Sequence, residues 1–348
     1  MLLKTLSELN GVSGDEKLVR DYIIENIKDK VDSYKIDKIG NLMAFKKSKD
    51  SSPRVAISAH MDEVGLFITE VTPEGYLKFQ NIGYIDPMIL VSKPILINNK
   101  IHGVIGSKAI HLQKPDERKQ AVQIDQLYID IGAFSKEEAE EQVKPGSFAA
   151  FTTEFTDFGS GFYKGKALDD RAGCAVIMEL LDQQYNCELT ALFTVQEELG
   201  LRGSKVISNN LEADLAIIIE ATSALDIQEH ERERRIVELG KGPACSIMDA
   251  GTIYNPKLIK KTTEIAEQSS IPFQFREGAQ AANDAGSIHL SRGGIPSITI
   301  SIPCRYIHSM SSVISKNDFD NCVRLLRIIL NRSGEYITLL NQSQRDQH

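Results

Sequence analysis

Several features that are common in proteins are missing from this sequence of 348 residues. It contains no tryptophan, and no apolar run reaches the length of a membrane span. A net charge of −8 leaves no excess of basic residues for binding nucleic acid or an anionic membrane surface. We therefore expect neither nucleic acid nor a membrane as a partner.

The cysteines are few and form no recognisable motif. They are odd in number and scattered along the chain, without a C-x-x-C pair, at Cys174, Cys187, Cys245, Cys304 and Cys322. The first residues, MLLKTLSELNGVSGDEK, lack the apolar core and the small-residue cleavage site of a signal peptide. Both features favour reduced thiols in a cytoplasmic protein.

The patterns that are present divide the chain into three stretches. Before residue 68, Ser13-x-x-Glu16 matches a capping box ahead of a helical spacing, and RVAISAHMDE predicts a strand leading to His60. Residues 68–160 hold short β runs interrupted by Gly, Pro and Asn, which is typical of a small barrel or sandwich. From residue 161 onward, strands and helices alternate. We therefore predict an α/β domain formed by residues 1–67 and 161–348, interrupted by a β-rich domain over residues 68–160.

Two adjacent glutamates follow one predicted strand. The segment LTALFTV (189–195) is apolar and uncharged, as in a strand buried on both faces, and Glu197 and Glu198 come just after it. A solvent-exposed turn is the simplest explanation of two adjacent glutamates after a strand. The residues at the ends of the other predicted strands favour a functional role for the pair instead.

Histidines and carboxylates also stand where the other predicted strands end or where a helix begins. They are His60 and Asp62, Asp169 and Asp170, Glu220 at the end of DLAIIIE, and His308 after SITISIPCRY. Ligands of open α/β sheets bind outside the carboxyl ends of the strands, so these side chains are expected along one edge. Burying so many carboxylates together is costly without a positive partner.

A pair of divalent metal ions would neutralise such a cluster. Mixed histidine and carboxylate ligands suit zinc, and also cobalt or manganese. Two-metal hydrolases hold their ions close together and bridge them with a shared carboxylate or water. One glutamate of the pair can then bind a metal while the other accepts a proton from water.

Six motifs of the chain resemble those of the M42 metallo-aminopeptidases, the glutamyl aminopeptidase and tetrahedral aminopeptidase group. They are AHMDEVG (59–65), KALDDRAG (166–173), VQEELGLRG (195–203), IEAT (219–222), DAGSIH (284–289) and RYIHS (305–309). They occur in the family's order and cover nearly the whole chain, which makes the resemblance far more specific than any single motif.

The resemblance implies a fold and an assembly. The fold is an α/β one, with a zinc-peptidase-like mixed sheet flanked by helices and interrupted by a small inserted β-barrel domain. That inserted domain would serve oligomerisation or substrate access. The implied substrates are peptides with a free amino terminus, and the implied assembly is a large homo-oligomer, a tetrahedral dodecamer.

The resemblance also implies a site with two divalent metal ions, zinc or cobalt, with manganese possible as well. The metal ligands carried over by position are His60 and Glu220 for one ion, Glu198 and His308 for the other, and Asp169 as the bridge. Glu197 would be the general base acting on a metal-activated water. Asp62 would orient the ring of His60.

The chain departs from the family pattern at two places. Glu220 stands where many members have Asp, and its longer arm could shift the position or preference of a metal. Ala281-Ala282-Asn283-Asp284 stands where Gly-Gly-Thr-Asp is expected. Asp170 and Arg171 are interpreted as making a structural contact, and the charged run around His230 as a solvated face.

Three alternatives to an aminopeptidase stay open. A metal-dependent N-deacylase of acylated amino acids or peptides would use the same ligands, and acceptance of a blocked amine separates it. A glycosidase of the endoglucanase type ranks low, because aromatic platforms are common there and this chain has no tryptophan. A binding module with a degenerate site would retain metal without turnover.

Overall fold

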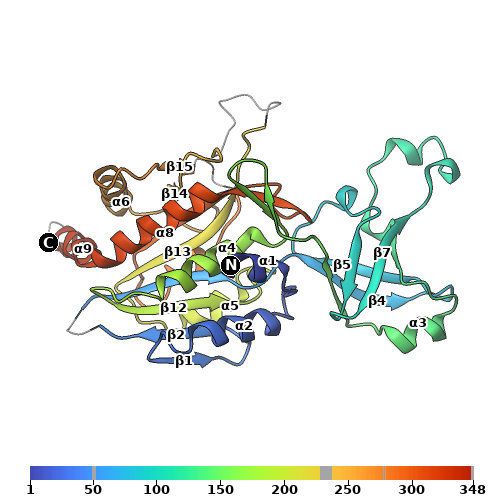
Figure 1. Cartoon of the computed structure of the whole chain (residues 1–348), viewed down its shortest axis with the longest axis horizontal. Coiled ribbons are helices and arrows are strands. Elements are labelled where there is room, and N and C mark those ends of the chain that lie inside the picture. The colour runs from blue at the N-terminus through green and yellow to red at the C-terminus, as the bar shows by residue number, and fades with distance from the viewer. Residues whose placement is uncertain (49–51, 228–236, 277, 279, 346–348) are drawn as a thin grey trace.

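The computed structural model (Figure 1) describes residues 1–48, 52–227, 237–276, 278 and 280–345. It has an α/β part built around an 11-stranded sheet, and a closed six-stranded barrel that projects from one side of it. No helix among these residues is long and apolar enough to cross a membrane. His230 and its charged run lie outside the described residues.

The large sheet has the strand order β1-β2-β12-β3-β13-β16-β17-β11-β10, with β14 pairing β15 and β16. Its strands are β1 (Ser33–Ile36), β2 (Leu42–Lys46), β3 (Arg54–His60), β10 (Thr156–Phe158), β11 (Phe162–Gly165), β12 (Glu188–Thr194), β13 (Leu215–Ser223), β14 (Ala244–Ser246), β15 (Gln274–Arg276), β16 (Ser297–Arg305) and β17 (Ser312–Ser315). The four central strands β12, β3, β13 and β16 run parallel. Their carboxyl ends therefore meet at one edge of the sheet, as the sequence predicted.

The barrel closes in the order β4-β5-β8-β7-β6-β9, so none of its strands is left as an open edge. Its strands are β4 (Gly65–Val71), β5 (Leu77–Ile82), β6 (Pro94–Ile97), β7 (Ile101–Ser107), β8 (Leu127–Asp130) and β9 (Phe148–Phe151). Short 3-10 helices stand in its connections: η1 (Pro87–Ile89), η2 (Ile110–Leu112), η3 (Glu117–Lys119) and η4 (Ile124–Gln126). The barrel has its own apolar core, which includes Leu66, Ile95 and Ile129.

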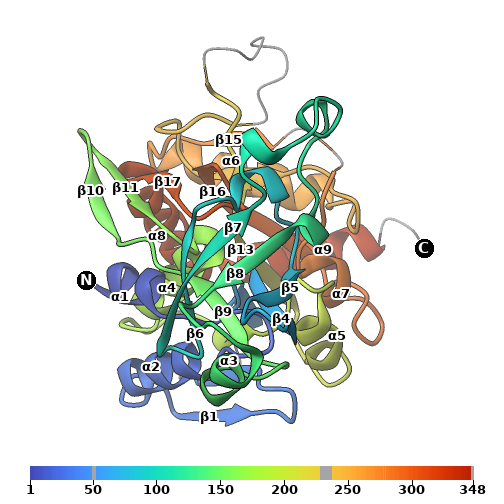
Figure 2. The same ribbon diagram turned by 90° about the vertical axis from the view of Figure 1, so that its right-hand side faces the viewer.

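Helices cover both faces of the large sheet, with α4 and α8 on one side and α5 and α7 on the other (Figure 2). The helices are α1 (Leu2–Glu8), α2 (Lys17–Ile27), α3 (Lys136–Gln142), α4 (Leu168–Leu180), α5 (Arg202–Ser208), α6 (Pro256–Gln268), α7 (Ala285–Ile288), α8 (Lys316–Asn331) and α9 (Ser333–Arg345). This arrangement, with the inserted barrel, confirms the predicted fold class.

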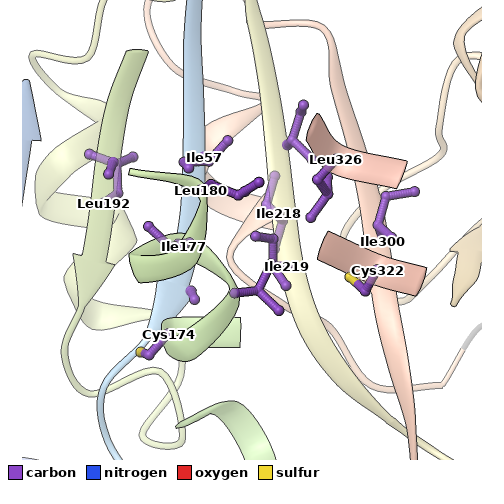
Figure 3. Close-up of a cluster of buried hydrophobic side chains, with 14 of the residues drawn as sticks. Ile57, Cys174, Ile177, Leu180, Leu192, Ile218, Ile219, Ile300, Cys322 and Leu326 are labelled. Atoms are coloured by element: carbon purple, nitrogen blue, oxygen red, sulfur yellow. The ribbon is translucent and has the colours of Figure 1, made fainter. Parts of the chain in front are cut away.

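The main core lies between the sheet and α4 with α8 (Figure 3). Ile177 and Leu180 of α4 face Ile57 of β3 and Ile219 of β13, and all four side chains are fully buried. Because α4 contacts β3, β13 and α8, it is apolar nearly all round rather than on one stripe. Its N-terminus, which carries Asp169 and Asp170, is thereby fixed next to the edge where the parallel strands end.

Two local predictions are wrong. Ser13-x-x-Glu16 forms no capping box: α2 has no side-chain cap, and the Ser13 hydroxyl donates to Asp62 instead. The strand predicted to end at Glu220 continues to Ser223, because β13 keeps pairing with β16 as far as Cys304. Glu220 therefore points from within a strand, whereas the other candidate ligands come from loops, strand ends or the start of a helix.

Candidate active site

One cavity, of about 690 Å³, lies at the carboxyl ends of the parallel strands. It is lined by six of the seven residues to which the resemblance gave a role at the site, His60, Asp169, Glu197, Glu198, Glu220 and His308. The seventh, Asp62, is fully buried directly behind His60. Residues spread over about 250 positions of the sequence are thus gathered at one place, as the strand-end argument predicted.

The two histidines lie on either side of Asp169. His60 Nε2 is 3.3 Å from Asp169 Oδ1 and 3.5 Å from Glu220 Oε1. His308 Nε2 is 3.3 Å from Asp169 Oδ2 and 3.3 Å from Glu198 Oε2. Each oxygen of Asp169 therefore faces a different histidine, and each histidine faces a second carboxylate.

Two groups of three residues in this cluster could each hold a metal ion, because their potential ligand atoms all lie within 4.8 Å of one another. The first group is His60, Asp169 and Glu198, and the second is His60, Asp170 and Glu220. The second group includes Asp170, which the sequence argument had assigned to a structural contact with Arg171. Asp170 is fully buried, and its Oδ2 has no hydrogen-bond partner among the described residues. Arg171 instead binds the carbonyls of Met61, Leu6 and Leu9.

The charge of the cluster is poorly compensated within the protein. Burial raises the pKa of Glu198 to about 7 and that of Glu220 to about 8, and it raises the pKa of Glu197 well above its usual range. Burial lowers the pKa of His308, but Asp169 and Glu198 outweigh it and bring the value to about 9. Buried carboxylates keep their protons near neutral pH when no nearby cation stabilises their charged form. Such raised pKa values are expected of a site whose cation is a bound ion rather than a side chain.

The loop after β12 is held by side chains from three other segments. Each of its four successive backbone N–H groups donates to a side-chain oxygen: Val195 to Asn41 (3.0 Å), Gln196 to Glu16 (3.1 Å), and Glu197 and Glu198 to the two oxygens of Asp62 (3.0 and 3.1 Å). The backbone that carries both glutamates is therefore fixed, although the loop belongs to neither a strand nor a helix.

Asp62 lies at the centre of this arrangement. Its Oδ1 is 3.3 Å from His60 Nδ1, and its Oδ2 accepts a hydrogen bond of 2.6 Å from the Ser13 hydroxyl. One carboxylate thus contacts the back of the His60 ring and the backbone of both glutamates. The sequence predicted the contact with His60 but missed Ser13 and Glu16, because their spacing was taken for a helix start.

Other residues at the cavity escaped the sequence argument altogether. Thr222, Ser246, Asp249 and Arg276 line the side of the cavity formed by β13, β14 and the segments next to them. None belongs to a pattern with metal-ligand spacing. Only Thr222 stands inside one of the quoted motifs. Asp284, the residue that this chain shares with the expected Gly-Gly-Thr-Asp, is buried and accepts a hydrogen bond of 2.6 Å from the Thr194 hydroxyl.

Comparison with known proteins gives a consistent result. The family model described as M42 glutamyl aminopeptidase matches residues 40–325. The lysyl aminopeptidase of Pyrococcus furiosus is 34% identical over 339 residues, covering 94% of this chain and 96% of that protein.

Solved structures are similar over the same extent. The TET aminopeptidase from a marine sediment archaeon, Thaumarchaeota archaeon SCGC AB-539-E09, has a TM-score of 0.92 and 34% identity, with 95% of each chain covered. The TET1 peptidase of Pyrococcus horikoshii, reported to assemble into a tetrahedron or a large octahedral shell, has a TM-score of 0.84 and 33% identity and covers 94% of this chain and 98% of its own.

Proposed function

The chain belongs to the M42 glutamyl aminopeptidase family, and from that premise we propose that it removes the first residue of peptides with a free amino terminus, using two divalent metal ions. The observation that carries the proposal is the symmetric placement of His60 and His308 about the two oxygens of Asp169, at 3.3 Å each, beside Glu197 in one cavity.

The donor set fits two ions. His60 and Glu220 would hold one, Glu198 and His308 the other, and Asp169 would bridge them, with Asp170 close to the first. Histidine nitrogens mixed with carboxylate oxygens suit zinc or cobalt, and manganese is a further option. The ions would also supply the positive charge that the buried carboxylates lack.

When bound, the metal ions would polarise the carbonyl of the first peptide bond, hold the free α-amino group and make water a stronger nucleophile. Glu197 is assigned as the general base: it takes a proton from the attacking water and passes it to the leaving amine. Asp62 accepts the Nδ1–H of His60 and so keeps Nε2 free toward the cavity. It also holds the backbone of Glu197 in place.

The test is hydrolysis of paired peptides, one with a free amino terminus and one N-acetylated, by the zinc- or cobalt-loaded protein and by a chelated control. Mass spectrometry is expected to find stepwise loss of single residues from the free peptide alone, abolished by chelation. Loss of the acetyl group would favour the N-deacylase instead. No change in either peptide would contradict both activities.

Glu197→Gln tests the base. The amide keeps the shape but cannot accept the proton, so kcat should fall by about 10²- to 10⁴-fold, the usual contribution of a general base. Metal content, measured by elemental analysis, should remain that of the wild type, because Glu197 is not an assigned ligand. Glu188→Gln, an exposed position at the other end of β12, is the matched control. Near-full activity of Glu197→Gln would exclude Glu197 as the base.

Domain roles and assembly complete the proposal. We assign the large-sheet part, predicted as residues 1–67 and 161–348, to catalysis, and the inserted part, predicted as residues 68–160, to oligomer contacts and substrate access. The barrel itself begins with β4 at Gly65, and β10 (Thr156–Phe158) pairs within the large sheet. A tetrahedral dodecamer is proposed by analogy with the TET1 peptidase of Pyrococcus horikoshii, which is described as a dodecamer and as assembling into a tetrahedron or a large octahedral shell. Five buried, unpaired cysteines support a reducing compartment such as the cytoplasm. The lysyl name of one relative and the glutamyl name of the family leave the preferred first residue open.

A further inference from the structure

Residues 13–16, whose spacing predicted a capping box, contact the loop after β12 instead of capping a helix. Glu16 accepts two backbone N–H groups at its Oε1, from Gly14 at 2.7 Å and from Gln196 at 3.1 Å. Glu16 is 4% exposed and is not among the residues that line the cavity. It therefore holds the loop without contributing to the cavity itself.

Gln196, the residue directly before the assigned base Glu197, has a left-handed backbone conformation. Its φ is 53°, a region that residues other than glycine seldom occupy because their Cβ then lies close to a backbone carbonyl. Such a conformation persists only where the surrounding structure holds it, and it is common next to catalytic groups. The contacts of Gln196 therefore decide in which direction the chain continues into Glu197.

The peptide groups on both sides of Gln196 are fixed by buried carboxylates. The N–H of Gln196 donates to Glu16, and the N–H of Glu197 donates to Asp62 Oδ1 at 3.0 Å. The carbonyl of Gln196 accepts a further hydrogen bond of 3.1 Å from the N–H of Arg202. Because φ and ψ of Gln196 set the angle between these two peptide planes, fixing both planes holds its left-handed conformation.

The two ends of the loop are joined by contacts that do not involve Glu16. The N–H of Gly203 donates to the carbonyl of Val195 at 3.0 Å. Asn41 accepts the N–H of Val195 at its Oδ1 and donates from Nδ2 to the carbonyl of Gly203, at 3.0 Å each. A Cβ on Gly203 would lie 2.3 Å from the Val195 oxygen and 2.4 Å from Asn41 Oδ1, so this closure requires glycine. Loss of the Glu16 acceptor would thus free the Gln196 peptide while the loop as a whole keeps its place.

We propose that Glu16 is a positioning residue for the general base: it holds Gln196 in the left-handed conformation from which the Glu197 side chain enters the cavity. Without this acceptor the peptide group before Gln196 can turn, and Glu197 then loses its alignment with the water and the peptide bond. The inference rests on the proposed aminopeptidase function, since Glu197 is a general base only within that reaction.

The effect of Glu16 falls on the base rather than on the metal ions. The N–H of Glu198, an assigned ligand, donates to Asp62 Oδ2 at 3.1 Å and does not depend on Glu16. Metal binding is therefore expected to survive the loss of Glu16, and the change is expected in turnover.

The test compares Glu16→Ala with Glu16→Gln in the metal-loaded protein acting on a peptide with a free amino terminus. Glu16→Ala removes the acceptor and should lower kcat about 10- to 100-fold with little change in KM, because a displaced catalytic group weakens turnover more than binding. Glu16→Gln keeps a side-chain oxygen that can accept both N–H groups and should stay within about threefold of the wild type. Glu138→Ala, which removes a glutamate acceptor of a backbone N–H in the barrel, is the matched control and should leave kcat unchanged. If Glu16→Ala does not fold, Glu16→Asp, whose shorter side chain withdraws the acceptor, takes its place.

Elemental analysis of the metal content and hydrogen exchange of residues 195–203, followed by mass spectrometry, accompany the kinetics. A Glu16→Ala protein with wild-type kcat would overturn the proposal. So would a loss of kcat that Glu16→Gln shares, or one explained by loss of metal. If the wild type cleaves no peptide, the aminopeptidase proposal fails, and hydrogen exchange alone decides whether Glu16 holds the loop. Faster exchange in Glu16→Ala than in Glu16→Gln would uphold that contact, and equal exchange would reject it.

Discussion

At the scale of single residues, the site depends on one buried carboxylate and the side chains that fix it. Asp62 contacts His60 and the backbone of Glu197 and Glu198, and the Ser13 hydroxyl fixes Asp62 Oδ2 at 2.6 Å. Ser13 touches neither the cavity nor a candidate ligand. We therefore assign it as a positioning residue that acts through Asp62, from a segment distant in the sequence.

Ser13→Ala should lower kcat about tenfold with little change in KM, because small displacements of a catalytic group weaken turnover more than binding. Ser13→Thr, which keeps the hydroxyl, should restore most of the activity. Ser135→Ala removes another hydrogen-bonded serine, the cap of α3 in the barrel, and should leave kcat unchanged. Steady-state kinetics of the three variants tests this. A Ser13→Ala protein with altered stability but wild-type kcat would show that Ser13 serves only the fold.

The sequence identified the residues with the most distinctive chemistry. Histidines and carboxylates at strand ends are rare enough to be noticed, so His60, Asp169, Glu198, Glu220 and His308 were all proposed as ligands, whereas Asp170 was taken for a structural residue. Ser13 was assigned to a capping box because of its spacing from Glu16, and Ser246 and Arg276 were not noticed, because a lone serine or arginine has no characteristic spacing. The places of the latter two at the cavity depend on which strands become neighbours, and that is decided by long-range pairing such as Ser246 with Arg276.

At the scale of elements, the sequence predicted α4 from its apolar spacing but did not predict the contacts that hold its N-terminus in place. Those contacts form a buried ion cluster of residues just before the helix and within its first turn. Lys166 Nζ lies 2.7 Å from both oxygens of Glu63, and Arg171 Nη2 lies 3.3 Å from one of them. Lys166 and Arg171 also bind the carbonyl of Leu9, so the same cluster holds the N-terminal segment against α4.

Lys166→Met should destabilise the protein by about 3 kcal/mol or more at pH 7, because it leaves part of the Glu63 charge uncompensated. Burial lowers the pKa of Lys166 to about 8, although Glu63 and the more distant Glu8 oppose that shift. Between pH 8 and about 10.4 the native state therefore releases a proton that the unfolded chain still holds. Over that window the Lys166 contribution to the free energy of unfolding rises with pH.

Urea unfolding at pH 7 and pH 9.5 measures both effects. The urea concentration at the unfolding midpoint should be higher for the wild type than for Lys166→Met. This difference between the two proteins should be larger at pH 9.5 than at pH 7. Lys164→Met, two residues earlier on β11 and half-buried, should follow the wild type at both values. Equal differences at the two pH values would contradict the lowered pKa.

At the scale of the whole molecule, the barrel presents apolar side chains to solvent. Ile110 and Leu112 in η2 are 70% and 63% exposed, and Phe134 is 91% exposed. The barrel projects away from the large sheet (Figure 1), and its β5–β6 connection lines the cavity with Tyr84, Asp86 and Ile89, whereas Ile110, Leu112 and Phe134 are not among the lining residues. The five proposed metal ligands already lie together within one chain, so we expect the ligand set to form without assembly.

These two facts predict that assembly and turnover can be separated. The double variant Ile110→Ser/Leu112→Ser removes two exposed apolar side chains from the barrel and should yield particles of lower mass than the wild type by mass photometry. Ile253→Ser, 81% exposed on the sheet domain, is the matched control and should keep the wild-type mass. The smaller particles should still cleave a dipeptide with kcat within threefold of the wild type. A wild type that is itself a monomer would refute the proposed assembly. A small particle that binds metal but cannot cleave the dipeptide would mean that a neighbouring subunit supplies part of the site.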